Sequence, residues 1–275
     1  MRDPYRLVLT PAGLKHPRVR EFLAARRRPA GRDVPCAVTL EGTSMLRQAL
    51  MAGVRLEAVF VCPARLQTAE GMALARQAVA AGAEGYEVSE RVLSRLADRD
   101  GPDGIAALGQ ARRRTLGEIR VGCRTRVVIA DGWDLPGNLG TLIRCADAAG
   151  ASGVLVVEQA FGLNHPLVLK ASMGAALTVP VVAVGRAAAR RWLRERGFRI
   201  VAADPAGRRS YRDVDYRGPL AIVVGSERRG LAREWLAAAD AIVAIPMLGV
   251  CDSLNAALAG ALLLYEALAQ DSHEP

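Results

Sequence analysis

Apolar and polar positions in the first third of the chain repeat with two different periods. Residues 36–42, 55–62 and 84–89 form short β-like runs, which predict strands. Residues 19–28, 43–53 and 66–82 instead have apolar side chains at three- and four-residue spacing, which predicts helices. Alternation of such strands and helices indicates a small α/β unit.

The rest of the chain carries longer and more apolar strands. Apolar runs occupy 126–131, 153–158, 179–184 and 198–204 and open the segments 220–231 and 241–249, with helical segments or turns between them. Continuous apolar strands separated by helices indicate a parallel sheet covered on both faces. A stretch rich in Gly, Pro and Arg separates this half from the first. We predict a smaller α/β domain at 1–110, a linker at 111–122 and a parallel-sheet domain at 123–275.

Composition narrows the class of protein. The chain has 275 residues and a formal charge of +9, which favours a polyanionic partner such as nucleic acid but also fits a merely soluble surface. Five scattered cysteines without a C-x-x-C pair, and three distant histidines, suggest no disulfide framework and no metal site. The N-terminus lacks a signal peptide's apolar core, and polar residues interrupt the last apolar run before membrane-spanning length. We expect a cytoplasmic protein without a membrane segment or a metal.

Three ends of predicted strands carry polar residues where a sheet of this kind binds ligands. The first end continues into a glycine-rich turn with Asn138, and Arg144 follows in the next helix. The second has Glu227 directly after a buried strand, and the third passes Ser253 and Asn255 where the last helix begins. Ser253 and Asn255 are also residue types that suit a helix cap. The glycines of the first end lack the G-x-G-x-x-G spacing, which argues against a nicotinamide enzyme.

Four segments carry a family resemblance. NLGTLIRCADAAGA, KASMGAA, VVGSERRGL and IPMLGVCDSLNAALAGALLLYEAL resemble, in order and spacing, the motifs of the SpoU (TrmH-type) RNA 2'-O-ribose methyltransferases of the SPOUT class. The resemblance covers roughly residues 125 to 269. It implies an α/β domain whose C-terminal segment threads a deep trefoil knot, a homodimer, and S-adenosylmethionine bound in the knot.

The first 110 residues resemble ribosomal protein L30e, a small α/β RNA binder that precedes the catalytic domain in several members of this family. The resemblance implies an RNA substrate-binding domain. A role in dimerisation or a purely structural role is the alternative. The basic residues near its start favour RNA, and they are Arg18, Arg20, Arg26, Arg27 and Arg28.

The resemblance also implies the cofactor site. In this family the adenosine of the cofactor is held largely by backbone groups. The matching positions here are Gly225, Ile245, Met247, Leu254 and Asn255. The apolar side chains among them can belong to the core at the same time, so a structural role and a binding role are compatible.

The implied catalytic residues are polar, and Arg144 matches the essential arginine of the family. The full set is Arg144, Asn138, Glu227, Ser253 and Asn255. A ribose 2'-hydroxyl is a poor nucleophile near neutral pH, so the reaction needs positioning and stabilisation of developing alkoxide charge. A guanidinium almost never gives up its proton, so orienting the hydroxyl through the adjacent phosphate is easier for Arg144 than acting as a base. Glu227 is expected to support the pocket, and Ser253 to cap the last helix as well.

The sequence therefore predicts an S-adenosylmethionine-dependent RNA 2'-O-ribose methyltransferase. We expect 23S rRNA as the substrate, with tRNA as the alternative. Some members of the family methylate rRNA to block a ribosome-targeting antibiotic, and the sequence does not separate that role from housekeeping modification. A non-catalytic RNA-binding protein of the same fold is a further alternative, but binding alone would not require the whole polar set.

Overall fold

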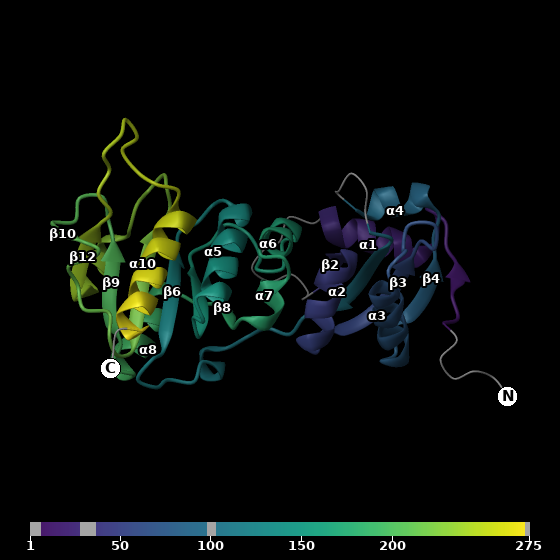
Figure 1. Cartoon of the computed structure of the whole chain (residues 1–275), viewed down its shortest axis with the longest axis horizontal. Helices are drawn as coiled ribbons and strands as arrows, with labels where there is room; N and C mark the ends of the chain where they lie inside the picture. Colours follow the sequence, from purple (N-terminus) through teal and green to yellow (C-terminus); the bar gives the residue numbers. More distant parts are fainter. Residues whose placement is uncertain (1–6, 28–36, 98–102, 273–275) are drawn as a thin grey trace. The chain divides into compact units, whose positions relative to one another are not determined.

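The computed structural model describes residues 7–27, 37–97 and 103–272, and contacts group the chain into two units (Figure 1). The first unit comprises Met1–Arg112 with Asn164–Thr178, and the second comprises Arg113–Leu163 with Val179–Pro275. The chain first passes from one unit to the other within the predicted linker. The assignment of an RNA-binding function to the first unit stays a prediction.

The first unit contains a five-stranded sheet with the order β1-β4-β3-β5-β2. The strands are β1 (Thr10–Pro11), β2 (Ala37–Glu41), β3 (Arg55–Val61), β4 (Glu84–Glu87) and β5 (Ile105–Gln110). The helices are α1 (Pro17–Arg27), α2 (Gly42–Met51), α3 (Ala69–Ala80) and α4 (Glu90–Leu96). Successive side chains of β3 point to opposite faces, so Phe60 packs with α1 and α4 while Val59 and Val61 pack with α2 and α3. The strands and helices predicted for this region are confirmed, and β1, β5 and α4 were not predicted.

A segment predicted to belong to the C-terminal domain groups with the first unit instead. It contains α6 (Pro166–Ala171) and α7 (Ala175–Thr178). Leu169 and Leu177 are buried in the same apolar cluster as Leu40 of β2 and Met45 of α2. Burial of apolar side chains therefore places α6 and α7 in the first unit. The sequence pattern did not predict this, because the segment forms no strand whose periodicity could be followed.

The second unit contains a seven-stranded parallel sheet with the order β10-β12-β9-β11-β6-β7-β8. Its strands are β6 (Arg126–Asp131), β7 (Gly153–Val157), β8 (Val181–Ala183), β9 (Arg199–Ala203), β10 (Arg209–Ser210), β11 (Leu220–Gly225) and β12 (Ala241–Ala244). The predicted parallel sheet is confirmed. The strands β6, β7 and β11 in the middle of the sheet are wholly buried, as continuous apolar runs require. The knot implied by the family resemblance stays a prediction.

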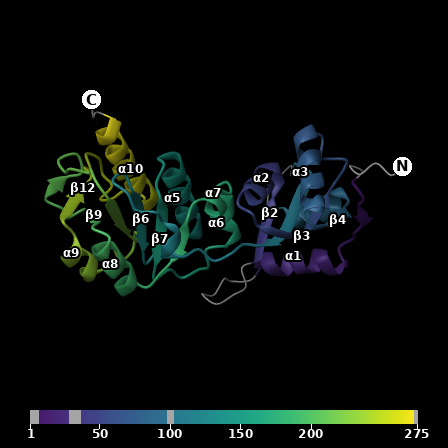
Figure 2. The same ribbon diagram turned by 90° about the horizontal axis from the view of Figure 1, so that it is seen from below.

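Helices cover both faces of this sheet (Figure 2). They are α5 (Pro136–Ala148), α8 (Arg186–Glu195), α9 (Arg233–Ala238) and α10 (Ala256–Ser272), with a short 3-10 helix η1 (Leu116–Glu118) before β6. Gly260 of α10 lies against Leu142 of α5 and Val224 of β11, so α5 and α10 share one face. Leu193 of α8 and Trp235 of α9 pack with Val223 on the other face.

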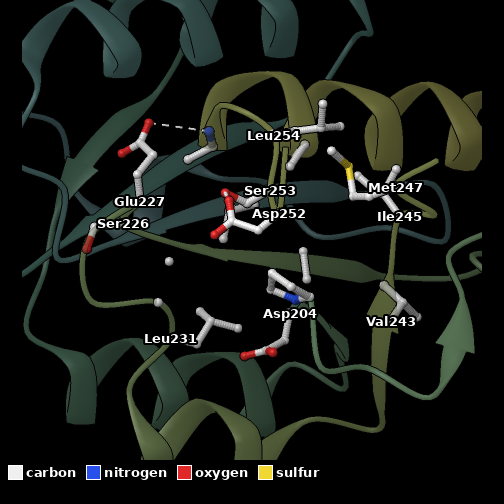
Figure 3. Close-up of a pocket in the computed structure, with 17 residues that line it drawn as sticks. Asp204, Ser226, Glu227, Leu231, Val243, Ile245, Met247, Asp252, Ser253 and Leu254 are labelled. Atoms are coloured by element: carbon white, nitrogen blue, oxygen red, sulfur yellow. Dashed lines mark hydrogen bonds between the residues drawn. The ribbon is translucent and has the colours of Figure 1, made fainter. Parts of the chain in front are cut away.

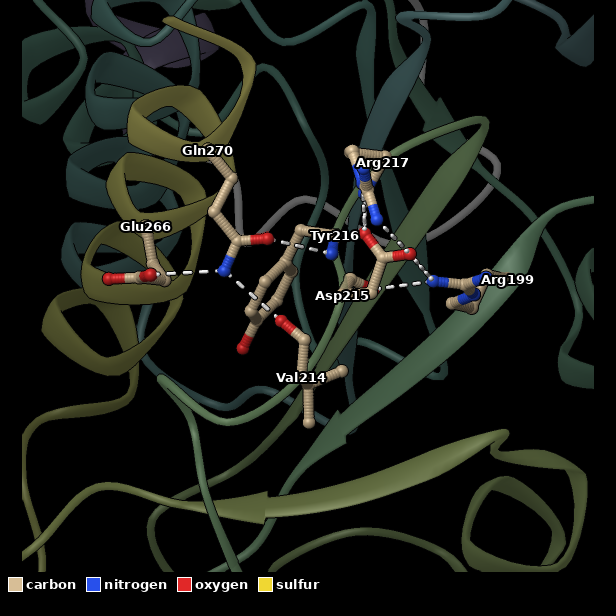
Figure 4. Close-up of polar contacts among 7 residues, drawn as sticks. All are labelled: Arg199, Val214, Asp215, Tyr216, Arg217, Glu266 and Gln270. Atoms are coloured by element: carbon tan, nitrogen blue, oxygen red, sulfur yellow. Dashed lines mark hydrogen bonds and ion pairs between the residues drawn. The ribbon is translucent and has the colours of Figure 1, made fainter. Parts of the chain in front are cut away.

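Polar contacts fasten the end of α10 to the loop before β11 (Figure 4). The side chain of Gln270 accepts a hydrogen bond from the backbone N–H of Tyr216 at 3.0 Å and donates one to the carbonyl of Val214 at 3.1 Å. The buried Tyr216 hydroxyl donates to the carbonyl of Tyr211, and burial raises the pKa of that phenol. Arg126 and Asp271 form a further ion pair. The C-terminal half of α10 is therefore held in place, which fixes where its N-terminus lies.

Candidate functional site

The carboxyl ends of β9, β11 and β12 meet at one edge of the sheet, because these strands are neighbours and run parallel. A cavity opens there, between the strand ends and the start of α10 (Figure 3). Six residues predicted from sequence to form the site line it, and they are Gly225, Glu227, Ile245, Met247, Ser253 and Leu254. The structure thus gathers two segments that are separate in sequence, as the strand-end argument expects.

Close backbone packing shapes the floor of this cavity. Gly225 ends β11, and a Cβ placed on it would lie 2.3 Å from the carbonyl carbon and oxygen of Gly230. The chain folds back sharply here, since Ser226 pairs with Gly230 in an isolated antiparallel bridge and Gly230 has a φ of +63°. The buried Trp133 indole donates to the carbonyl of Val224 at 3.0 Å, which fixes the strand end. Only glycine fits at position 225.

The Glu227 carboxylate joins three parts of the second unit. One of its oxygens accepts hydrogen bonds from the side chain of Asn138 at 2.5 Å, from the side chain of Asn255 at 3.4 Å and from the backbone N–H of Ala256 at 3.3 Å. Ala256 is the first residue of α10, where unpaired N–H groups favour an anion. Figure 3 draws the Glu227 contact with this helix start. Two predicted site residues, Asn138 and Asn255, therefore converge on the carboxylate of a third, although neither of them lines the cavity.

Asn255 caps the last helix, and the prediction that Ser253 does so was wrong. The Asn255 side-chain oxygen accepts from the backbone N–H groups of Ala257 at 3.0 Å and Leu258 at 3.3 Å. Ser253 lies two residues further back, too far from the first turn, and its hydroxyl donates to Asp252 at 3.2 Å. Ser253 is thus left facing the cavity (Figure 3).

The structure corrects the expected turn around Asn138. Helix α5 begins at Pro136, so Gly137 and Asn138 lie in its first turn and not in a loop before it. Proline suits the first helical position because its φ is already helical and its missing N–H would have no partner there. The amide of Asn138 consequently projects from a rigid element toward Glu227.

Arg144 is exposed on α5 and does not line the cavity. Among the described residues its guanidinium has no hydrogen bond and no ion pair, which leaves its five donors available. Burial raises the pKa of the neighbouring Cys145 thiol, against the opposite influence of Arg144, so this thiol stays neutral near neutral pH. A cation that forms no ion pair with the described residues, Asp147 of the same helix included, can meet an external anion.

Sequence reasoning missed two carboxylates near the site. Asp204 follows β9 and lines the cavity, and one of its oxygens accepts from the backbone N–H of Ala206 at 2.8 Å. Asp131, buried at the end of β6, accepts from Arg186 at 3.1 Å and 3.2 Å. Both follow apolar strands directly, so position at a strand end is the signal that could have found them.

The charge of the cavity is opposite to that of the whole chain. Its lining includes three carboxylates and no Lys, Arg or His. They are Asp204, Glu227 and Asp252. Their hydrogen-bond donors among the described residues are neutral N–H and O–H groups, so the cavity carries a surplus of negative charge within a chain of formal charge +9. Such a cavity favours a cationic small molecule.

The described residues contain neither a metal-binding cluster nor a membrane-spanning helix. No group of three or more His, Cys, Asp and Glu side chains there is placed to hold a metal ion. Within the same part of the chain, no helix is both long and apolar enough to cross a bilayer. The expectation of a metal-free reaction stays a prediction.

Two family models match the chain. Residues 125–265 match the model of the SpoU rRNA Methylase family, and residues 16–107 match that of the MRM3-like substrate binding domain. The first match includes every residue predicted for the site and all strands of the second unit's sheet. The second match extends from α1 into β5 and leaves β1 outside.

Relatives with similar sequence or structure carry related names. A putative TrmH family tRNA/rRNA methyltransferase of Staphylococcus haemolyticus is 40% identical over 141 residues, which are 51% of this chain and only 57% of that relative. The 23S rRNA (guanosine-2'-O-)-methyltransferase RlmB of Ralstonia nicotianae is 35% identical over 73% of this chain and 82% of its own length. The crystal structure of an AdoMet-bound rRNA methyltransferase from Sinorhizobium meliloti has a TM-score of 0.83 and 30% identity, covering 99% of this chain and all of that one. The chain therefore belongs to the SpoU rRNA methylase family.

Proposed function

We propose that this protein is an S-adenosylmethionine-dependent RNA 2'-O-ribose methyltransferase. The observation that carries the proposal is the cavity at the ends of β9, β11 and β12, where six residues from two family motifs meet. The proposal is further supported by the AdoMet-bound relative from Sinorhizobium meliloti, which covers nearly the whole chain. The first unit, which matches a substrate-binding domain, is the proposed RNA-binding part.

The cavity fits the proposed cofactor in shape and charge. Gly225 lets the chain pass where a Cβ would collide with backbone, which leaves peptide groups bare for an adenosine. Apolar side chains beside it suit the flat faces of the base, and Val224, Leu231, Val243, Ile245 and Leu254 supply them. The surplus carboxylates suit a sulfonium and an ammonium group.

The chemistry divides the roles of this chain's residues. S-adenosylmethionine would supply the methyl group from its sulfonium: the ribose 2'-oxygen would take the methyl group, the sulfur would keep the bonding electrons as a neutral thioether, and the hydroxyl proton would pass to water. Arg144 would bind the phosphate beside that hydroxyl and stabilise negative charge developing on the oxygen. Glu227 holds Asn138 and the start of α10 in one arrangement, so it would position both sides of the pocket.

We propose 23S rRNA as the substrate, in line with the name of the relative from Ralstonia nicotianae. tRNA is the second candidate, because the Staphylococcus haemolyticus relative carries both RNAs in its name. Mapping ribose methylation in rRNA and tRNA from cells with and without the gene identifies the nucleotide. A site at a known antibiotic contact of the ribosome, with resistance lost on deletion, would assign a self-protection role. An unchanged methylation map in both RNAs would favour the non-catalytic RNA-binding alternative.

The acidic cavity predicts a preference for the cofactor over its demethylated product. The cofactor has a net charge of +1 because of its sulfonium, whereas the thioether product is neutral overall. Asp204→Asn keeps the oxygen that accepts from Ala206 but removes the charge. A half-exposed carboxylate contributes up to about 1 kcal/mol to a cation, so cofactor affinity should fall about two- to fivefold while product affinity changes little.

Calorimetric titration of both ligands measures this difference, with Glu195→Gln on α8 as a matched control that should alter neither affinity. Equal weakening for cofactor and product would show that Asp204 acts through structure and not through charge.

We also propose a homodimer, with the outer face of α10 at the interface. Leu258, Leu262 and Tyr265 are 50%, 39% and 48% exposed and recur at four- and three-residue spacing, so they form one apolar stripe. Light scattering should give about twice 29.2 kDa at low micromolar concentration. Leu262→Glu should shift the protein to a monomer, because a charge would be buried without a partner. A monomeric wild-type protein would contradict the proposal.

A further inference from the structure

Helix α8 places a row of arginines on the outside of the second unit. Ala189 and Leu193 face inward and are fully buried, which directs the opposite side of the helix to solvent. Arg191, Arg194 and Arg196 are exposed on or just beyond that side. Figure 2 shows α8 beside α9 on the face of the sheet that lies away from α5 and α10.

These arginines lack the acidic partners that other arginines of the chain have. In the first unit Arg18 binds Glu21 and Glu84, Arg47 binds Glu70 and Arg65 binds Glu90. On α8, the described residues provide no ion pair for Arg190, Arg191, Arg194 or Arg196, and Glu195 is the helix's one acidic residue. The buried Nε of Arg190 also has no hydrogen-bond partner among the described residues. Arg186 at the start of α8 pairs with Asp131 and Glu234, so the uncompensated charge of this helix lies on the four later arginines.

Simpler accounts explain only part of this arrangement. The negative end of the helix dipole stabilises cations in the last turn, which covers Arg194 and Arg196 but not Arg190 or Arg191. Solubility needs charge of either sign, and mixed charges serve it as well as one sign does. Repulsion among neighbouring cations destabilises a helix slightly, so an uncompensated row indicates an external anion.

We propose that the outer face of α8, defined by Arg190, Arg191, Arg194 and Arg196, binds phosphates of the RNA substrate. This inference rests on the proposed function, and it adds a contact surface on the catalytic unit to the one expected on the first unit. Six residues of helix rise by about 9 Å, so the four guanidinium groups are spread over a length that can reach more than one phosphate of an RNA strand. Guanidinium groups bind phosphate through paired N–H donors.

The composition of this face favours RNA over a membrane or a protein partner. A helix that lies on a bilayer needs large apolar side chains on its buried side, and a protein interface needs an apolar centre. The exposed residues of α8 are arginines, a glutamate and an alanine, and Trp192 packs half-buried against Phe198 with ring centroids 5.1 Å apart. The face also lies opposite the proposed dimer stripe, so both surfaces can be used together.

Salt-dependent binding tests the inference. The triple variant R191Q/R194Q/R196Q is titrated with an unmodified 23S rRNA transcript and an unmodified tRNA transcript at several salt concentrations. Each lost phosphate contact should reduce the slope of log K against log salt by about 0.7–0.9, so the triple variant should lose roughly two units for the substrate RNA. Affinity at low salt should fall at least tenfold, while cofactor binding measured by calorimetry stays unchanged.

The matched control is R199Q/R217Q, which removes two cations that already share Asp215 (Figure 4). For each charge removed, the control should change the slope of log K against log salt far less than the triple variant does. An unchanged slope in the triple variant would overturn the inference, and so would an equal effect of triple variant and control. If the triple variant loses as much affinity for polyglutamate as for RNA, the face binds anions in general, and this result would also overturn the inference. If the wild type methylates no RNA yet the slope falls as expected, the proposed function fails and the α8 surface stands.

Discussion

Replacing Arg144 with alanine is expected to lower methyl transfer by roughly 10²–10³-fold, the loss typical of one preorganised charge-stabilising donor. The side chain is exposed on α5, lies outside the cavity and makes no hydrogen bond or ion pair among the described residues. Its removal should therefore leave folding and cofactor binding nearly intact. Single-turnover transfer of labelled methyl groups to RNA measures the rate, and calorimetry measures the cofactor affinity of the same preparation.

Two further variants separate shape from charge at this position. Arg144→Lys should not restore activity, because a point charge cannot reproduce a planar fork with two donors. Asp147→Ala, one turn further along α5 and also exposed, should behave like the wild type. If Arg144→Ala loses cofactor affinity in proportion to its activity, Arg144 supports cofactor binding and not catalysis. Near-normal turnover of Arg144→Ala would show that Arg144 is not part of the active site.

Replacing Gly225 with alanine is expected to damage both folding and cofactor binding. The new Cβ would lie 2.3 Å from the Gly230 carbonyl group and 2.5 Å from the Leu231 nitrogen, which are backbone atoms that cannot rotate away. Overpacking of this kind costs about 1–3 kcal/mol, or a Tm lower by roughly 2–12 °C for a unit of this size. Because the displaced loop also carries Glu227, cofactor affinity should fall beyond what the lower stability explains.

Thermal unfolding and calorimetric titration measure the two effects of the Gly225 variant. Gly122→Ala is the control, since a Cβ there meets no atom within 4 Å. A variant at 225 with a wild-type Tm and wild-type affinity would show that the loop is free to move, and the rigid floor assigned to the cavity would be wrong.

The sequence predicted every strand of the second unit's sheet except the two-residue β10, because long apolar runs follow from burial on both faces of a parallel sheet. Helix starts were harder to predict. Pro136 begins α5 earlier than the glycines suggested, and Asn255 caps α10 where Ser253 was expected. Several polar residues near the start of α10 could cap it. The one that does depends on where α10 packs, which contacts such as Gly260 against Leu142 determine.

Contacts between distant residues were beyond sequence reasoning. Glu227 meets Asn138 across 89 residues and Asn255 across 28, and nothing in either local pattern specifies the pairing. Asp204 escaped notice because it belongs to none of the four family-like segments, although it follows a strand. The Arg18 expected to contact RNA is bound to two glutamates, and Arg28 lies outside the described residues. Local patterns thus predict elements, whereas pairing depends on the fold.

Methyl transfer to defined RNA decides whether the protein methylates ribose 2'-hydroxyl groups. Purified protein, labelled S-adenosylmethionine and unmodified 23S rRNA or tRNA transcripts are incubated together, and the RNA is digested to nucleosides for analysis by mass spectrometry. We expect the wild type to produce a labelled 2'-O-methyl nucleoside, and Arg144→Ala to produce it at a rate reduced by about two to three orders of magnitude. Label on a base and not on the ribose, or no transfer to either RNA by a protein that binds the cofactor, would contradict it.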